Sequence, residues 1–367
     1  MTHVDHLTLS ELRIPFRTTF RHASAERSET SSVWVVAASG RWAGYGESCP
    51  RPYVTGETIE SARAFFAEHQ DPLRRDVSGL DSLRAWMAAH EPAIDRNPAA
   101  WCAIELALLD LFARAAGRTL DDLLSLPPLA GPFRYTAVLG DAGDDAFAAL
   151  VRGYGELGFI DFKLKLSGDA DRDRRRCALV AGLDVPGLRL RVDANNLWAD
   201  ADAAVAHLLG LGCRLSGVEE PIGAGRYVEL ARIGDALDCR IVLDESFVAA
   251  RQFGAIERLP GRWAINVRVS KMGGLLRSLQ VVSAARARGI PIVVGAQVGE
   301  TSVLTRAALT VAQAAGDALL AQEGAFGTRL LQHDVTEPCL MFGPGGVLDP
   351  AWYPSLGDAG LGLRMTR

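Results

Sequence analysis

The chain lacks the sequence features of several protein classes. Its six cysteines form no C-x-x-C pair, which argues against a disulfide framework and a zinc site and predicts reduced, mostly buried thiols. No apolar run approaches the roughly 18 residues of a membrane span. The first residues, Met-Thr-His-Val-Asp-His, contain neither the basic nor the apolar region of a signal peptide, so we expect a cytoplasmic protein.

The charge balance argues against one class of partner. The 367 residues carry a net charge of −5 and no basic stripe, which argues against binding to nucleic acid. A content of 49% hydrophobic and 23% charged residues is typical of a globular protein with a substantial core. The length suits one large and one small domain.

Strand and helix patterns divide the chain. Alternating apolar residues predict strands at 6–15 and 32–38, and helical periodicity follows over 58–117. Strands followed by helices predict a small α+β domain over residues 1–125. Beyond the proline-rich segment 126–129, strand and helix alternate. The eight predicted strands of this part cover residues 134–139, 160–166, 188–195, 215–221, 239–246, 263–271, 291–297 and 318–324.

This alternation predicts an α/β fold of the (β/α)8 barrel type over residues 126–325, with residues 326–367 returning to the small domain. Five of the strands end in charged side chains at intervals of about 24 to 30 residues. These residues are Lys163 and Lys165, Asp193, Glu219, Asp244, and Arg268 with Lys271. Because the carboxyl ends of barrel strands share one rim, the side chains should converge. Crowded carboxylates favour a hard divalent metal such as Mg2+, with a lysine beside it.

At these positions the chain resembles the enolase superfamily, in its muconate-lactonizing-enzyme and dipeptide-epimerase branch. The resemblance extends to residues 44–47 (Gly-Tyr-Gly-Glu), 52–57 and 103–111, so it covers nearly the whole chain. One K-x-K motif is weak evidence, but six ordered motifs at barrel spacing are strong. The resemblance implies a cap domain over a (β/α)7β barrel, one Mg2+ ion with Mn2+ as a substitute, and removal of a proton next to a substrate carboxylate.

The resemblance and the chemistry assign roles to the rim residues. Three carboxylates are the expected metal ligands: Asp193, Glu219 and Asp244. A divalent ion on the substrate carboxylate would stabilise the dianion that forms when the neighbouring proton leaves. The adjacent Glu220 and Glu245 are alternative ligands; otherwise Glu245 and Asn195 are expected to support the ligands or the base from outside the ligand set.

Lys165 is the expected base, and Lys163 is expected to lower its pKa and to contact the substrate carboxylate. Residues 163 and 165 share one face of a strand, whereas Leu164 faces the helices. The family pattern N-x-K-x-x-K-x-G-G is altered here, because Arg268 occupies its first lysine position. Guanidinium does not readily accept a proton, so one-base chemistry is predicted, with Arg268 as an electrostatic partner. Lys271 has the opposite strand parity and should point to the barrel exterior or rim, unless a bulge redirects it.

Five residues are candidates for substrate binding: His22, Tyr53, Gln297, Glu300 and Glu323. The two cap loops, 20–27 and 48–53, carry cations and an aromatic residue, which suggests a substrate with an anionic or carbonyl group remote from the metal. The aspartate pair with which dipeptide epimerases hold an amino group is absent, so Glu323 is the remaining candidate for an ammonium group.

The leading hypothesis is therefore a Mg2+-dependent lyase or isomerase that forms an enolate from a small-molecule carboxylate. Its one-base reaction would be an elimination of water, as in o-succinylbenzoate synthesis, or a cycloisomerisation of the muconate type. The first alternative is a racemase or epimerase of an amino-acid derivative or dipeptide, which needs Lys271 or another group on the opposite face. The second is a non-catalytic carboxylate-binding relative, which retention of Lys163 and Lys165 argues against. A homo-oligomer of undefined size is expected.

Overall fold

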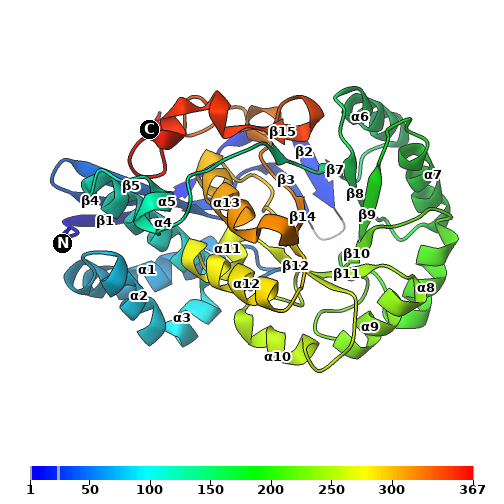
Figure 1. Ribbon diagram of the computed structural model, residues 1–367, viewed down its shortest axis with the longest axis horizontal. Helices are drawn as coiled ribbons and strands as arrows, with labels where there is room; N and C mark the ends of the chain where they lie inside the picture. The colour runs from blue at the N-terminus through cyan, green and yellow to red at the C-terminus, as the bar shows by residue number, and fades with distance from the viewer. Residues whose placement is uncertain (1, 23–24, 367) are drawn as a thin grey trace.

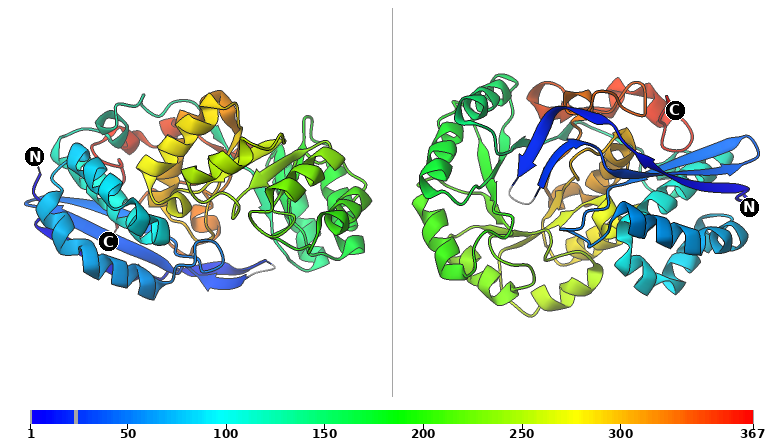
Figure 2. Two further views of the ribbon diagram at one scale, coloured as in Figure 1. Left: turned by 90° about the horizontal axis from the view of Figure 1, so that it is seen from below. Right: turned by 180° about the vertical axis from the view of Figure 1, so that it is seen from behind.

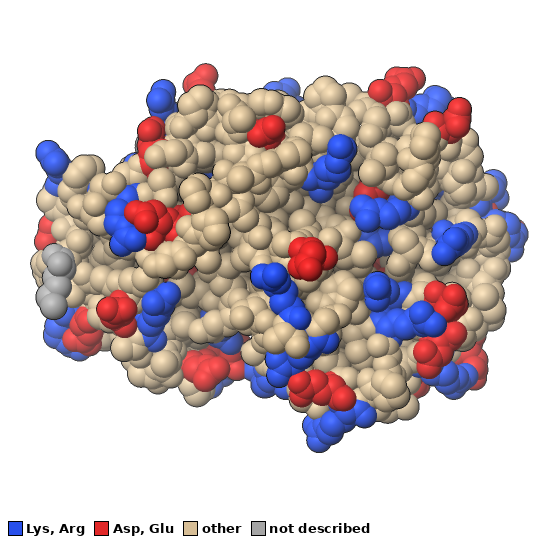
Figure 3. Space-filling model, viewed as in Figure 1, with Lys and Arg blue, Asp and Glu red and all other residues tan. Residues whose placement is uncertain are grey.

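The computed structural model describes residues 2–22 and 25–366, without the side chains of residues 20–26. A ring of strands surrounded by helices forms the larger part, and an antiparallel sheet with helices packs beside it (Figure 1). No helix in the described part of the chain is both long and apolar enough to cross a membrane. On the face drawn in Figure 3, acidic and basic side chains are interspersed rather than gathered by sign.

The small domain contains the predicted strands and helices. Its sheet has the order β1-β4-β5, formed by β1 (His6–Leu12), β4 (Ser32–Ser39) and β5 (Trp42–Ser48). Strands β2 (Pro15–His22) and β3 (Ala25–Glu29) form a separate hairpin. The helices are α1 (Ile59–Asp76), α2 (Leu80–Ala89), α3 (Glu91–Arg96), α4 (Pro98–Ala115) and α5 (Leu120–Leu123). Seen from behind, the hairpin crosses in front of the barrel (Figure 2).

Two glycines let strand β5 pack directly on helix α4. A Cβ at Gly44 would lie 2.2 Å from the carbonyl oxygen of Ala107, and one at Gly46 would lie 1.9 Å from that of Ala103. Backbone atoms cannot move aside as a flexible side chain can, so only glycine fits at these positions. The Gly-x-Gly of residues 44–46 is therefore a packing motif of the cap.

We expect Gly46→Ala to lower the free energy of unfolding by about 1–3 kcal/mol, because the added methyl group overpacks this contact. Urea unfolding followed by circular dichroism measures the change. Gly79→Ala is the matched control in the same domain, since its Cβ would meet no atom within 4 Å. Equal stability of the two variants would contradict the packing argument.

The larger part is an eight-stranded parallel sheet that closes into a barrel, as predicted. Its strands, in spatial order from β7 to β14, are β7 (Ala137–Leu139), β8 (Asp161–Lys165), β9 (Arg189–Asp193), β10 (Gly217–Glu219), β11 (Arg240–Leu243), β12 (Trp263–Val267), β13 (Ile292–Val294) and β14 (Leu319–Gln322). The Thr136 amide, next to β7, donates a 2.7 Å hydrogen bond to the carbonyl of Gln322 in β14. This bond joins the two ends of the sheet.

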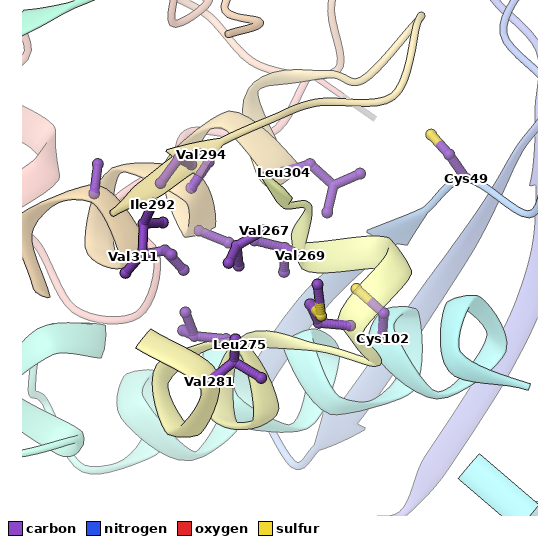
Figure 4. Close-up of a cluster of buried hydrophobic side chains, with 14 of the residues drawn as sticks. Cys49, Cys102, Val267, Val269, Leu275, Val281, Ile292, Val294, Leu304 and Val311 are labelled. Atoms are coloured by element: carbon purple, nitrogen blue, oxygen red, sulfur yellow. The ribbon is translucent and has the colours of Figure 1, made fainter. Parts of the chain in front are cut away.

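Helices connect the strands on the outside of the barrel. They are α6 (Asp144–Glu156), α7 (Ala170–Ala181), α8 (Ala201–Gly210), α9 (Tyr227–Ala236), α10 (Phe253–Ile256), α11 (Val269–Met272), α12 (Leu275–Ala287) and α13 (Ser302–Ala315). Figure 4 shows how outward side chains of β12 and β13, such as Val267 and Ile292, pack against Leu275 of α12 and Val311 of α13. All six cysteines are free, and four of them are buried.

The segment after β14 contacts both parts of the molecule. Strand β15 (Val347–Leu348) pairs with β6 (Phe133–Arg134) beside the barrel. Farther on, the Leu361 amide donates to Asp110 of α4 at 2.7 Å. We retain the division into residues 1–125, 126–325 and 326–367 as a proposal.

Candidate active site

The two lysines of β8 lie inside the barrel mouth. Leu164 between them is fully buried in the main apolar core, whereas Lys163 and Lys165 line one cavity. Strand register pairs Lys165 with Asp193. The ammonium group of Lys165 donates to Asp193 Oδ2 at 2.8 Å and to Asn195 Oδ1 at 3.1 Å. The period of the strand thus sends both lysines to one face, as predicted.

Lys163 lies among three carboxylates. Its Nζ is 2.8 Å from Glu219 Oε2, 3.2 Å from Asp193 Oδ2 and 3.1 Å from Glu323 Oε2. Burial lowers the pKa of Lys163, but these carboxylates together raise it above its ordinary value. For Asp193 the two effects are reversed. Burial raises its pKa, but the positive charges of Lys165 and Lys163 hold that pKa below the usual range. Lys163 is therefore a fixed cation in this arrangement.

At the ends of β10 and β11, each expected metal ligand and the acidic residue that follows it have different surroundings. Glu219 faces Lys163, whereas Glu220, at φ +37°, accepts hydrogen bonds from the amides of Asp244 and Ser246 at 2.6 and 2.7 Å. Asp244 lies in the barrel interior, and Glu245 lines the cavity. Burial raises the pKa of Glu220 to about 8 and that of Glu245 to about 7. Glu220 thus ties together the turn after β11 and does not point to the lysines.

Arg268, directly after β12, also lies at the rim. Its guanidinium donates to Asp244 Oδ2 and, at 3.2 Å, to Gln297 Oε1, and it is 3.6 Å from Glu219 Oε1. Burial lowers the pKa of Arg268, but Asp244 and Glu219 raise it above its already high value. In the spatial order of the strands, β8 and β12 are separated by three strands on either side. The strands that carry Lys165 and Arg268 therefore lie on opposite sides of the mouth, and both residues line the same cavity.

The expectation that Lys271 points to the exterior or rim is wrong. Strand β12 ends at Val267, and Lys271 belongs to the short helix α11, so strand parity does not apply to it. Its fully buried Nζ donates to Asp244 Oδ1 and the carbonyls of Asp244 and Asn266 at 2.7, 2.8 and 2.7 Å. It is not among the residues that line the cavity. The sequence did hint that Lys271 belongs to the site, because the chain has only three lysines and the other two are Lys163 and Lys165.

The three expected metal ligands come together, but with cations between them. Lys163 bridges Asp193 and Glu219, and Arg268 bridges Glu219 and Asp244. Within residues 2–22 and 25–366, no three acidic, histidine or cysteine side chains form a ready metal-binding cluster. The donor set nevertheless suits Mg2+, since Asp193, Glu219 and Asp244 offer buried carboxylate oxygens, the ligand type that this ion prefers. The residues fit the ion chemically, provided that the bridging cations move.

The cavity at the mouth has a volume of about 650 Å3 and includes four of the five predicted substrate contacts. These are Tyr53, Gln297, Glu300 and Glu323. The side chain of His22 lies outside the described part of the structure. Burial raises the pKa of Glu300 to about 7, and Glu300 accepts a 2.6 Å hydrogen bond from the Gln297 amide.

Glu323 lines the cavity and is paired with two cations. It pairs with Lys163 and, at 3.0 Å, with Arg191, while each oxygen keeps further acceptor capacity, so its role in holding a substrate ammonium group stays a prediction. The sequence reasoning missed Arg191, which also donates to Thr136 Oγ1 at 3.0 Å. Arg191 precedes Asp193 by two residues on β9, and this same-face spacing is the signal that could have found it.

Comparisons with known proteins agree with this geometry. Residues 146–366 match the family model described as enolase C-terminal domain-like. The chain is 31% identical over 319 residues to the L-Lys-D/L-Arg epimerase of Methylococcus capsulatus, covering 84% of this chain and 85% of that protein. It is 27% identical to a chloromuconate cycloisomerase of Cupriavidus necator, with 84% of each protein covered.

A solved structure shows the same fold. The dipeptide epimerase of Cytophaga hutchinsonii, complexed with Mg and the dipeptide D-Ala-L-Val, matches with a TM-score of 0.86 and 21% identity, covering 100% of this chain and 96% of that chain. The family model spans more than half of the chain, and the two sequence relatives of the chain named above are enzymes. The chain therefore belongs to the enolase superfamily, in the group that includes the dipeptide epimerases and muconate cycloisomerases.

Proposed function

We propose that this protein is a Mg2+-dependent enzyme that removes the proton next to a substrate carboxylate from one face only, and that it catalyses an elimination or a cycloisomerisation. The observation that carries the proposal is the unlike pair at the barrel mouth: Lys165 on β8 and Arg268 after β12 come from opposite sides of the barrel and line the same cavity. An amine can exchange a proton with carbon, whereas a guanidinium remains charged. Only one face of the substrate then meets a base.

Each residue has one task in this proposal. Lys165 Nζ accepts the proton, and Asn195, which binds that Nζ at 3.1 Å, orients it. Arg268 supplies a fixed positive charge on the opposite side, where negative charge develops. Gln297 lies beside it with a buried Nε2 that has no hydrogen-bond partner, and this group can donate to a substrate oxygen.

We further propose that Asp193, Glu219 and Asp244 hold Mg2+, which, when bound, supplies Lewis-acid stabilisation of the enolate. The Mg-containing structure of the dipeptide epimerase supports this assignment by analogy. With these carboxylates on the ion, Lys163 would be available to bind the substrate carboxylate.

The metal assignment is tested by a property other than activity. We expect Mg2+ at about 100 times its Kd to stabilise the wild type by about 2.7 kcal/mol against unfolding. Asp193→Asn and Glu219→Gln should lose this stabilisation, because each removes a charged ligand. Asp141→Asn is the matched control, since Asp141 lines the cavity but pairs with Arg172 and Arg176 at 2.9 and 3.0 Å. Equal stabilisation of Asp193→Asn and the control would overturn the assignment.

The second candidate function is epimerisation or racemisation of an amino-acid derivative. The 31% identical epimerase favours it. It requires a second base opposite Lys165, and Lys271 is the remaining lysine. The three hydrogen bonds of its Nζ and its absence from the cavity wall weigh against that role.

A further inference from the structure

The active-site cavity has two chemically different ends. Its inner end is polar and contains Lys165, Arg268 and Gln297. Its other wall is formed by helix α6 and by the chain after β14, which contributes Phe326 and Leu330. We call this second region the apolar arm. A volume of about 650 Å3 exceeds what a small carboxylate alone would fill, so the arm has room for a further substituent.

Helix α6 presents small side chains to the arm. Ala146, Ala149 and Gly153 recur at intervals of three and four residues, which places them on one face of the helix, and all three line the cavity. The larger Leu150 and Tyr154 of the same helix complete this apolar wall. A Cβ added to Gly153 would meet no atom within 4 Å. Glycine within a helix reduces stability relative to alanine, and no close backbone contact requires it here. At position 153 the missing side chain leaves open volume beside the polar end.

The orphan donor of Gln297 independently indicates a ligand. Gln297 is 5% exposed, its Oε1 accepts from Arg268, and its Nε2 has no partner. A buried amide donor without a partner is costly, so an acceptor atom of a bound molecule is expected next to it. The orphan donor therefore places a polar atom of the ligand at the polar end, next to the arm.

The arm offers no free carboxylate to a cation. Four carboxylates line the cavity among the described residues: Asp141, Glu245, Glu300 and Glu323. Asp141 lies at the α6 side and pairs with Arg172 and Arg176. Glu245 follows Asp244 directly after β11, and Glu300 accepts from the Gln297 amide, so both belong to the polar end. Glu323 is held by Lys163 and Arg191 at the polar end. The charged side chain at the outer end of the arm is Arg329, which lies 4.9 Å from the ring of Phe342. An ammonium or guanidinium group placed in the arm would lose water without gaining a partner.

We propose that the substrate is a carboxylate with a bulky, uncharged apolar substituent, aromatic or branched alkyl, which packs against α6 at Gly153 and against Phe326. The proposal rests on the proposed function for the placement of the carboxylate at the Lys165 end. It adds the substrate class, and it makes Gly153 the residue that sets the size of the substituent.

Binding of simple carboxylates to the Mg2+-loaded protein, measured by isothermal titration calorimetry, tests the proposal. Four probes share a carboxylate and differ in their tails. Propionate has no further tail, 3-phenylpropionate has an apolar tail, 6-aminohexanoate has a cationic tail and adipate has an anionic tail. We expect 3-phenylpropionate to bind about 10- to 100-fold more tightly than the other three, because the arm buries its ring. Tighter binding of 6-aminohexanoate or adipate, or no binding of 3-phenylpropionate at millimolar concentration, would overturn the proposal.

Gly153→Leu should remove most of the advantage of 3-phenylpropionate and leave propionate binding unchanged. Leucine is a better helix former than glycine, so this variant should fold. Gly254→Leu on α10 is the matched control, because its Cβ also meets no atom within 4 Å, and it should bind all four probes as the wild type does. Unchanged 3-phenylpropionate binding in Gly153→Leu would contradict the role of α6.

The outcomes separate this inference from the proposed function. If the arm exists but the catalytic assignment is wrong, 3-phenylpropionate binding will respond to Gly153→Leu, and no carboxylate will exchange its proton in D2O. If the catalytic assignment is correct but the arm does not take an apolar group, proton exchange will occur without the preference for the phenyl tail.

Discussion

Lys165→Ala should lose proton exchange at the carbon next to the substrate carboxylate, by about 10²–10⁴-fold, because the proposed base is removed. Exchange of hydrogen for deuterium in D2O, followed by NMR, measures this step without knowledge of the product. The apolar carboxylates that bind to the cavity are the substrates to use. The loss should exceed that of any cavity variant that leaves Lys165 in place.

Lys165→Arg distinguishes a base from a positive charge. Arginine can keep the ion pair with Asp193, which Lys165 makes at 2.8 Å, but it cannot accept the proton. We expect this variant to be as inactive as Lys165→Ala while Mg2+ still stabilises it. Recovery of exchange in Lys165→Arg would mean that position 165 provides charge alone, and the base would have to be sought elsewhere.

The second large effect is expected at Arg268. Arg268→Met removes the fixed cation beside Asp244 and Glu219, and we expect proton exchange to fall by about 10²–10³-fold, as when one donor to a developing oxyanion is removed. Melting temperature and Mg2+-induced stabilisation show whether the folded, metal-binding protein is retained. Activity equal to that of the wild type would exclude an electrostatic role for Arg268.

Arg268→Lys is the informative partner variant. It places an amine opposite Lys165, so exchange on the second face of the substrate should appear if the shorter side chain reaches the carbon. Stereospecifically deuterated product identifies the face. Loss of the original exchange without gain on the second face would indicate that guanidinium geometry, and not charge alone, is needed.

The regular part of the fold was accessible from sequence. Strand and helix periods alternate along the barrel, and each predicted strand overlaps an observed one. The positions of Lys163, Lys165, Asp193 and Glu219 on one rim follow from the two-residue period of strands and the common direction of barrel strands.

The irregular connections were not accessible in the same way. Lys271 reaches Asp244 because the chain after β12 turns into helix α11, a change that strand parity could not reveal. The ion pair between Glu323 and Arg191 was not foreseen either, because the strand of Arg191 lies elsewhere in the barrel. Pairing between distant strands depends on side-chain geometry inside the closed barrel, and a single sequence does not define it.

The most direct test of the account is the stereochemistry of exchange in the wild type. Each enantiomer of a chiral carboxylate that the cavity binds is incubated with the Mg2+-loaded enzyme in D2O, and deuterium incorporation and configuration are measured together. We predict incorporation into one enantiomer with retention of its configuration, because in the proposed arrangement Lys165 meets one face of the substrate and Arg268 the other. Deuterium incorporation into both enantiomers at comparable rates, with their interconversion, would contradict the one-base account and assign a second base to the face of Arg268.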